Sequence, residues 1–101
     1  MKKKGFIALL SLIFGLSVTS TVWASPCDTM ICMIGKASGQ SGGDSCKKPV
    51  EDFFAVKRFH HGDLDPGPTA DARRELLQQC PGWQKNTSSI DTVIDLFGTV
   101  E

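Results

Sequence analysis

The hydrophobic positions of this chain form one continuous run near its start and short periodic groups thereafter. The run extends from Phe6 to about Val18, after three lysines at positions 2–4 and before the triplet Val22-Trp23-Ala24. A basic start, a short apolar core and small residues at the end predict a secretory signal peptide that is cleaved between Ala24 and Ser25. The run is shorter than the roughly 20 residues that span a bilayer, which disfavours the alternative of an uncleaved anchor.

The periodic groups predict four short helices in the exported part, residues 25–101. The clearest amphipathic pattern belongs to the fourth helix, where apolar residues fall at i, i+3, i+4 and i+7. This helix starts at Ser88 or Ser89 and ends at Gly98. Its apolar residues are Ile90, Val93, Ile94 and Phe97.

The first predicted helix begins with a Ser25 cap, has Pro26 at the first helical position and carries Asp28 in its first turn. Its segment Met30–Ile34 is apolar on all sides, which predicts burial of most of its surface. Glycines end the helix, and a flexible, Gly-rich connector follows. The connector comprises Gly39, Gln40, Ser41, Gly42 and Gly43.

The second predicted helix opens at Pro49, with acidic residues near its start and basic residues near its end, an order that complements the helix dipole. Its apolar stripe extends to Phe59. Residues 62–68 contain two glycines and two prolines, which predicts a turn. Thr69 caps a third helix, whose apolar positions at spacings of three and four turn Cys80 toward the core. The basic residues assigned to the end of the second helix are Lys57, Arg58, His60 and His61.

No period-2 strand pattern stands out, so the sequence predicts an all-α fold, a small four-helix bundle. Residues 25–101 suffice for one small domain. Three of the 11 basic residues lie in the leader, so this domain keeps eight against 11 acids, a net charge near −3. That balance argues against a nucleic-acid partner, because nucleic-acid-binding modules carry a basic excess.

The four cysteines all lie in the exported part, and an even number in a short exported chain predicts disulfides that staple the helices. Their spacings match neither a zinc site nor a redox motif. If the first helix begins at Pro26, Cys27 and Cys32 point about 140° apart and do not meet. This favours Cys32–Cys46 with Cys27–Cys80. A helix that begins after Cys27 leaves open the alternative of Cys27–Cys32 with Cys46–Cys80.

One cluster has the residue types of a metal site. Its histidines and aspartates can bind zinc, and alternating aspartates can bind calcium. The distant bidentate Glu of a calcium loop is absent and Pro66 interrupts the spacing, so a helix end followed by a turn is the favoured interpretation, with metal binding left open. The cluster comprises His60, His61, Asp63 and Asp65.

No motif predicts catalysis or a cofactor. The chain has no G-x-S-x-G, and its connector lacks the G-K-[ST] ending of a phosphate-binding loop. We therefore expect a protein that is not an enzyme. Trp83, which follows Cys80-Pro81-Gly82, is interpreted as a cover for the end of the bundle, with a role as an anchor for a partner as the alternative.

Several of these residues together resemble the TrbM/KikA family of conjugal transfer proteins. The resemblance runs through the four cysteines, the segment Gly35-Lys36-x-x-Gly39-Gln40-Ser41-Gly42-Gly43, and the steps Phe53-Phe54 and His61-Gly62. It continues through Asp65-Pro66-Gly67, Thr69-x-x-Ala72-Arg73 and Leu76-x3-Cys80-Pro81-Gly82. It covers most of residues 25–101, and the short chain is closest to the KikA-like branch.

The resemblance implies a periplasmic accessory protein of a plasmid conjugative transfer system, in contact with protein components of a type IV secretion apparatus. The KikA-like branch also implies toxicity toward some hosts. No catalytic residue carries over. An inhibitor of a cell-wall hydrolase is the alternative function. The surface assigned to partners comprises the connector Gly39–Gly43, the turn residues Asp65, Pro66 and Gly67, and Trp83.

Overall fold

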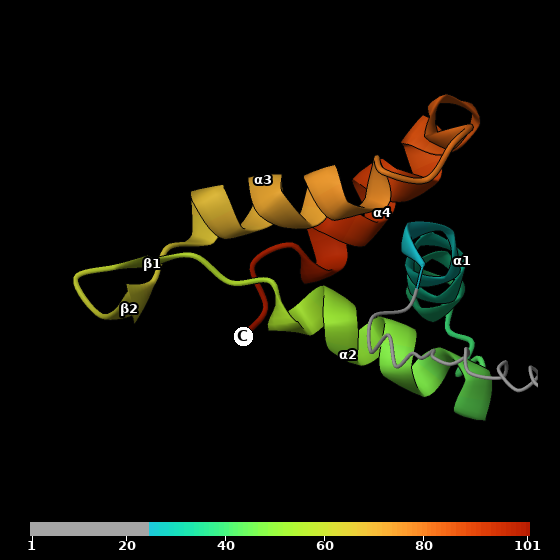
Figure 1. Ribbon diagram of the computed structural model, residues 1–101, viewed down its shortest axis with the longest axis horizontal. Helices are drawn as coiled ribbons and strands as arrows, with labels where there is room; N and C mark the ends of the chain where they lie inside the picture. The colour runs from blue at the N-terminus through green and yellow to red at the C-terminus, as the bar shows by residue number, and fades with distance from the viewer. Residues whose placement is uncertain (1–24) are drawn as a thin grey trace, which may run out of the picture.

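The computed structural model describes residues 25–101, and the predicted leader, residues 1–24, lies outside the described residues. Four α-helices, two 3-10 helices and one short hairpin form this part of the chain (Figure 1). The predicted all-α fold with four helices is confirmed. The elements are α1 (Pro26–Ala37), η2 (Asp44–Cys46), α2 (Lys47–Ala55), β1 (Phe59–His60), β2 (Asp63–Leu64), α3 (Pro66–Leu77), η3 (Trp83–Asn86) and α4 (Thr87–Phe97).

Helix α1 begins as predicted and fixes the cysteine pairing. The Ser25 hydroxyl accepts a hydrogen bond of 3.1 Å from the Asp28 N–H, and Pro26 is the first helical residue. The disulfides are Cys27–Cys80 and Cys32–Cys46, which is the favoured pairing. The second disulfide joins α1 to η2, which leads directly into α2. Helices α1 and α2 cross, since Figure 1 shows α1 end-on where α2 runs across the view.

All four helices contribute to one core. Ile31 is an exception to the predicted burial of α1: its side chain is 64% exposed, so one face of α1 is open to solvent. The apolar stripe of α4 packs as predicted, with Ile90 and Val93 buried and Ile94 and Phe97 partly buried. The buried core residues are Met30, Met33, Phe53, Leu77, Cys80, Ile90 and Val93.

Helix α2 departs from the prediction at both ends. It starts before Pro49, because η2 leads directly into it, and it ends at Ala55. The basic residues expected at its C-terminal end, Lys57, Arg58, His60 and His61, therefore lie outside the helix. Phe59 does not extend the apolar stripe: its side chain is 60% exposed.

The predicted turn at residues 62–68 is instead a hairpin followed by a helix. Strands β1 and β2 pair antiparallel, with Phe59 opposite Leu64 and His60 opposite Asp63. The two residues between the strands, His61 and Gly62, both have positive φ (53° and 85°), the backbone of a tight two-residue hairpin turn. The strands were missed because two residues each are too few to show alternation.

Helix α3 begins four residues earlier than predicted: its first residue is Pro66, and the cap position is held by Asp65 and not by Thr69. Thr69 lies inside the helix and is fully buried. Its hydroxyl accepts a 2.9 Å hydrogen bond from the Arg58 N–H and donates one of 3.2 Å to the Arg58 carbonyl. This side chain therefore ties the base of the hairpin to α3.

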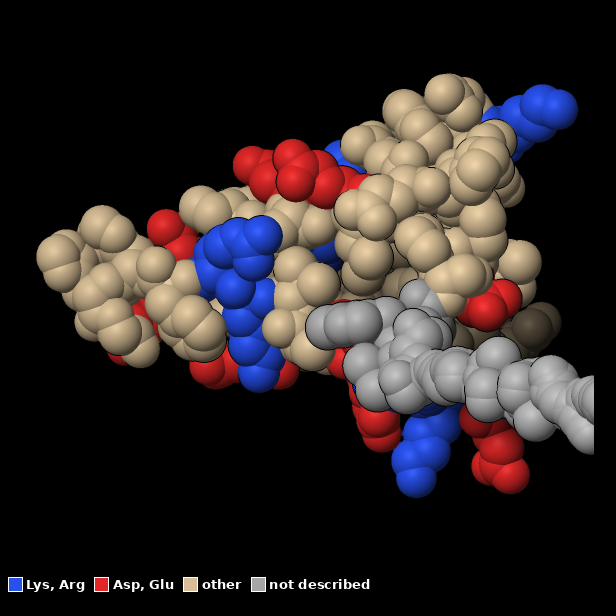
Figure 2. Space-filling view, viewed as in Figure 1, with Lys and Arg blue, Asp and Glu red and all other residues tan. Residues whose placement is uncertain are grey.

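The surface carries charges of both signs. Figure 2 shows acidic and basic side chains interspersed over one face of the molecule, with no continuous basic area. Within residues 25–101, no helix has the length and apolar character needed to cross a membrane.

Candidate functional site

The Gly-rich connector is first of all a helix stop. Gly39 has a left-handed backbone (φ 88°), and the N–H groups of Gly39 and Gln40 donate to the carbonyls of Lys36 and Gly35, respectively. These two bonds form a Schellman motif, which satisfies the last carbonyls of α1. Because these N–H groups point back into α1, they are not free to surround a phosphate group.

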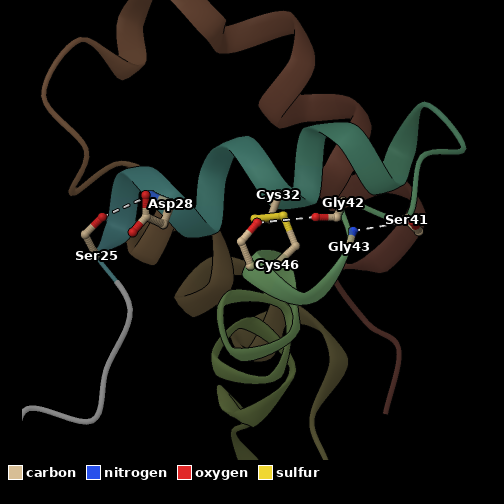
Figure 3. The surroundings of a disulfide bond; sticks show 8 residues. Ser25, Asp28, Cys32, Ser41, Gly42, Gly43 and Cys46 are labelled. Carbon is tan, nitrogen blue, oxygen red and sulfur yellow. Dashed lines mark hydrogen bonds between the residues drawn. A yellow bond between two sulfur atoms is a disulfide. The ribbon is translucent and has the colours of Figure 1, made fainter.

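The second half of the connector closes over the Cys32–Cys46 disulfide (Figure 3). Gly42 has φ of 73°, and a Cβ at this position would lie 2.5 Å from the Cys46 sulfur. Only glycine fits there. Gly43, which precedes η2, has φ of 67°, and a Cβ at this position would meet no atom within 4 Å. The glycines of this segment are thus explained by the path of the chain from α1 to α2.

The connector borders an open hollow of about 320 Å³ between α1 and α2. Charges of both signs line it, from Lys36, Lys47 and Glu51, together with the polar side chains of Gln40 and Ser41. The Lys36 ammonium also lies 5.6 Å from the centre of the Phe97 ring. The mixture of charges selects no single ligand class.

Asp65, Pro66 and Gly67 form the start of α3. Asp65 is the residue before the helix, and its N–H donates to the Arg58 carbonyl at 2.7 Å. Pro66 and Gly67 are exposed. Trp83 is partly buried and packs against the core cluster, as a cover for its end would.

The structure does not bring these predicted partner-binding residues together. In Figure 1 the connector joins α1 to α2 at the right of the molecule, whereas Asp65–Gly67 begin α3 at the left, next to the hairpin. The predicted residues therefore mark separate surfaces.

The histidines of the predicted metal cluster lie at the tip of the hairpin. The rings of His60 and His61 contact each other edge to face, with centroids 4.0 Å apart. Within residues 25–101, no group of three or more His, Cys, Asp or Glu side chains is close enough to hold a metal ion.

Arg73 is a fully buried charged residue that was not predicted to have a role. Its side chain has 0% exposure. It donates to the carbonyls of Val56 (2.9 Å) and Phe54 (3.3 Å) at the end of α2. It also donates to those of Phe97 (2.7 Å) and Val100 (2.6 Å) at the end of α4.

Because these carbonyls form the negative ends of two helices, they stabilise the cation. Burial lowers the pKa of the Arg73 guanidinium, since desolvation penalises its charged form. A usable signal was present: Thr69, Arg73 and Leu77 fall at i, i+4 and i+8, so Arg73 lies on the face of α3 that packs inward.

A second hollow, of about 260 Å³, lies between α1 and η2. The side chains of Asp28 and Ile31 line it from α1, the Cys32–Cys46 disulfide from its floor and Ser45 from η2. This hollow could not be expected from the sequence, because the apolar surroundings of Ile31 predict that its side chain is buried.

Comparison with known proteins finds no matching family model, no matching curated protein and no matching solved structure.

Proposed function

We propose that this chain is an exported accessory protein of a plasmid conjugative transfer system, which acts in the periplasm through contacts with proteins of a type IV secretion apparatus. The observation that carries the proposal is the combination of four cysteines with the segment Gly35–Gly43, which resembles the TrbM/KikA family. The two disulfides of this chain are consistent with an oxidising compartment outside the cytoplasm.

Several of the residues that carry the resemblance also shape this fold. They are the four bonded cysteines, Gly39 and Gly42 in the connector, and Arg73. The role we propose is non-catalytic, since no catalytic residue carries over from the resemblance.

The direct test is a deletion of the gene from a transfer-proficient plasmid, with transfer frequency measured in several donor and recipient pairs. We expect a lower frequency, which the intact gene restores in trans and a gene without codons 2–24 does not. Unchanged transfer in every pair would refute the proposal. Growth of hosts that express the chain with and without its leader measures the toxicity that the KikA-like resemblance implies.

A further inference from the structure

The two most exposed large apolar side chains of the described part lie on different elements: Ile31 on α1 and Phe59 on β1. Figure 1 shows the hairpin and α1 at opposite ends of the molecule. A single exposed apolar side chain needs no explanation. Here, however, the two lie beside charges of opposite sign, with Asp28 near Ile31 and with Lys57 and Arg58 next to Phe59.

The hairpin projects from the rest of the molecule (Figure 1). Its base is fixed by the two hydrogen bonds of the buried Thr69 hydroxyl to Arg58 and by the Asp65 N–H. Phe59 and Leu64 are paired across the strands, so their side chains share one face, while His60 and Asp63 share the other. Because the backbone that carries Phe59 is already held at its base, binding through this side chain requires little further ordering of the backbone, which favours a role as an anchor.

The open hollow between α1 and η2 has the volume and part of the lining that an aromatic ring needs. Its volume of about 260 Å³ exceeds the roughly 150 Å³ that suffices for a benzene molecule. Ile31 forms one wall, and the Cys32–Cys46 disulfide lies at the floor. Apolar carbon and sulfur are both favourable neighbours for an aromatic ring.

The charges at the two surfaces are complementary. Asp28 lines the hollow and forms no ion pair with another described residue. Lys57 and Arg58 directly precede Phe59, and they too form no ion pair within residues 25–101. Asp63 lies on the face of the hairpin that does not carry Phe59.

We propose that the hairpin of one copy of this chain inserts Phe59 into the hollow beside Ile31 of a second copy, with Lys57 or Arg58 placed near Asp28. Because the two surfaces are different and lie at opposite ends, the contact is head-to-tail and generates a ring or an open chain of copies. The contact is small, so association is weak and depends on concentration. This inference does not depend on the proposed function in conjugation.

The test uses the exported, processed protein in sedimentation equilibrium over a wide concentration range. Phe59→Ala removes the aromatic side chain from the hairpin and leaves the hollow unchanged. Ile31→Asp places a charge in the wall of the hollow and leaves the hairpin unchanged. We expect each variant alone to lose self-association by at least about tenfold, the effect of removing an interface anchor. A mixture of the two should form a 1:1 heterodimer and nothing larger, because only one intact pair of surfaces remains.

Leu96→Ala is the matched control, since Leu96 is also an exposed apolar residue (51%) but lies on α4; it should associate like the wild type. Asp28→Asn should weaken association by about two- to fivefold, the range for one exposed ion pair. Circular dichroism and thiol counts establish that each variant is folded and oxidised.

Three results would overturn the proposal. The first is a wild-type protein that stays monomeric at every concentration. This result refutes the proposal even if Phe59 then proves to contact another protein or a lipid vesicle. The second is self-association that survives either substitution. The third is a mixture of the two variants that forms no heterodimer.

Discussion

At the residue scale, the described part of this chain depends on a cation where a small core would ordinarily have an apolar side chain. Arg73 is fully buried, and its guanidinium lies 5.3 Å and 5.2 Å from the ring centres of Phe53 and Phe54. It joins two helix ends that are far apart in sequence. A lysine could not do the same, because its single ammonium cannot reach carbonyls of both α2 and α4 in the fork geometry of a guanidinium.

We therefore predict that Arg73→Met destabilises the protein by about 2–4 kcal/mol, because it removes four charge-assisted hydrogen bonds while it keeps an unbranched apolar stem. Urea unfolding of the oxidised protein measures the loss. Arg74→Met is the matched control: Arg74 is part-exposed and pairs with exposed Asp91 at 2.6 Å, so its removal should cost under about 1 kcal/mol. Equal losses in the two variants would show that the buried hydrogen bonds carry no special weight.

Gly42 is the second residue with a demanding role. We predict that Gly42→Ala costs more than Gly43→Ala, because both force alanine into a positive φ but only the Cβ at position 42 meets the Cys46 sulfur. The expected loss is about 1–2 kcal/mol for Gly43→Ala and clearly more for Gly42→Ala, with free thiols in part of the Gly42→Ala protein. Thermal unfolding and a thiol assay measure both effects. Indistinguishable variants would mean that the connector moves aside at little cost.

At the element scale, α1 and α4 could be predicted because their signals are local. Ser25 and Pro26 mark the start of α1, and the four apolar positions of α4 repeat with the helical period. The end of α2 and the start of α3 could not be placed, because their partners are distant in sequence. Arg73 donates a hydrogen bond to the Val56 carbonyl at the end of α2. Thr69 is a residue type that favours helix caps, but its hydroxyl accepts a hydrogen bond from the Arg58 N–H at the base of the hairpin.

The same contrast explains the candidate site. The connector was identified from its composition, but its glycines turned out to shape the chain path. The hairpin with Phe59 was missed because Phe59 extends the apolar stripe of the second predicted helix. The hollow with Ile31 was missed because the segment around Ile31 is apolar on all sides, which predicts burial. Exposure at these two positions depends on where α2 ends and how α1 crosses it.

The anchoring of the hairpin can be tested through the two buried threonines. Thr69→Val should cost about 1–3 kcal/mol, because it leaves the Arg58 N–H without its hydroxyl partner, and amide exchange at Arg58 should accelerate. Thr29→Val is the control, since the Thr29 hydroxyl is buried and has no hydrogen-bond partner. That substitution should be neutral or stabilising. Similar losses for the two, measured by urea unfolding, would argue against a specific anchor.

At the scale of the whole molecule, size is the controlling quantity. A single core in a chain of this length supplies about 3–5 kcal/mol, most of which one unfavourable substitution can remove. The loop-entropy estimate assigns about 3 kcal/mol to Cys32–Cys46 and about 4 kcal/mol to Cys27–Cys80, whose cysteines are 14 and 53 residues apart. The two bridges together therefore contribute at least as much as the core. The fold and the oxidising compartment are physically linked.

Reduction and alkylation of both disulfides should therefore abolish cooperative unfolding at 37 °C, as measured by circular dichroism, because the core alone leaves little net stability. The bridges should also differ. Cys27→Ala with Cys80→Ala should destabilise more than Cys32→Ala with Cys46→Ala, by about 1 kcal/mol, because the first pair closes the longer loop. A reduced chain that unfolds at the midpoint of the oxidised protein would contradict this account, and it would allow the same fold to form in a cytosol where thiols stay reduced.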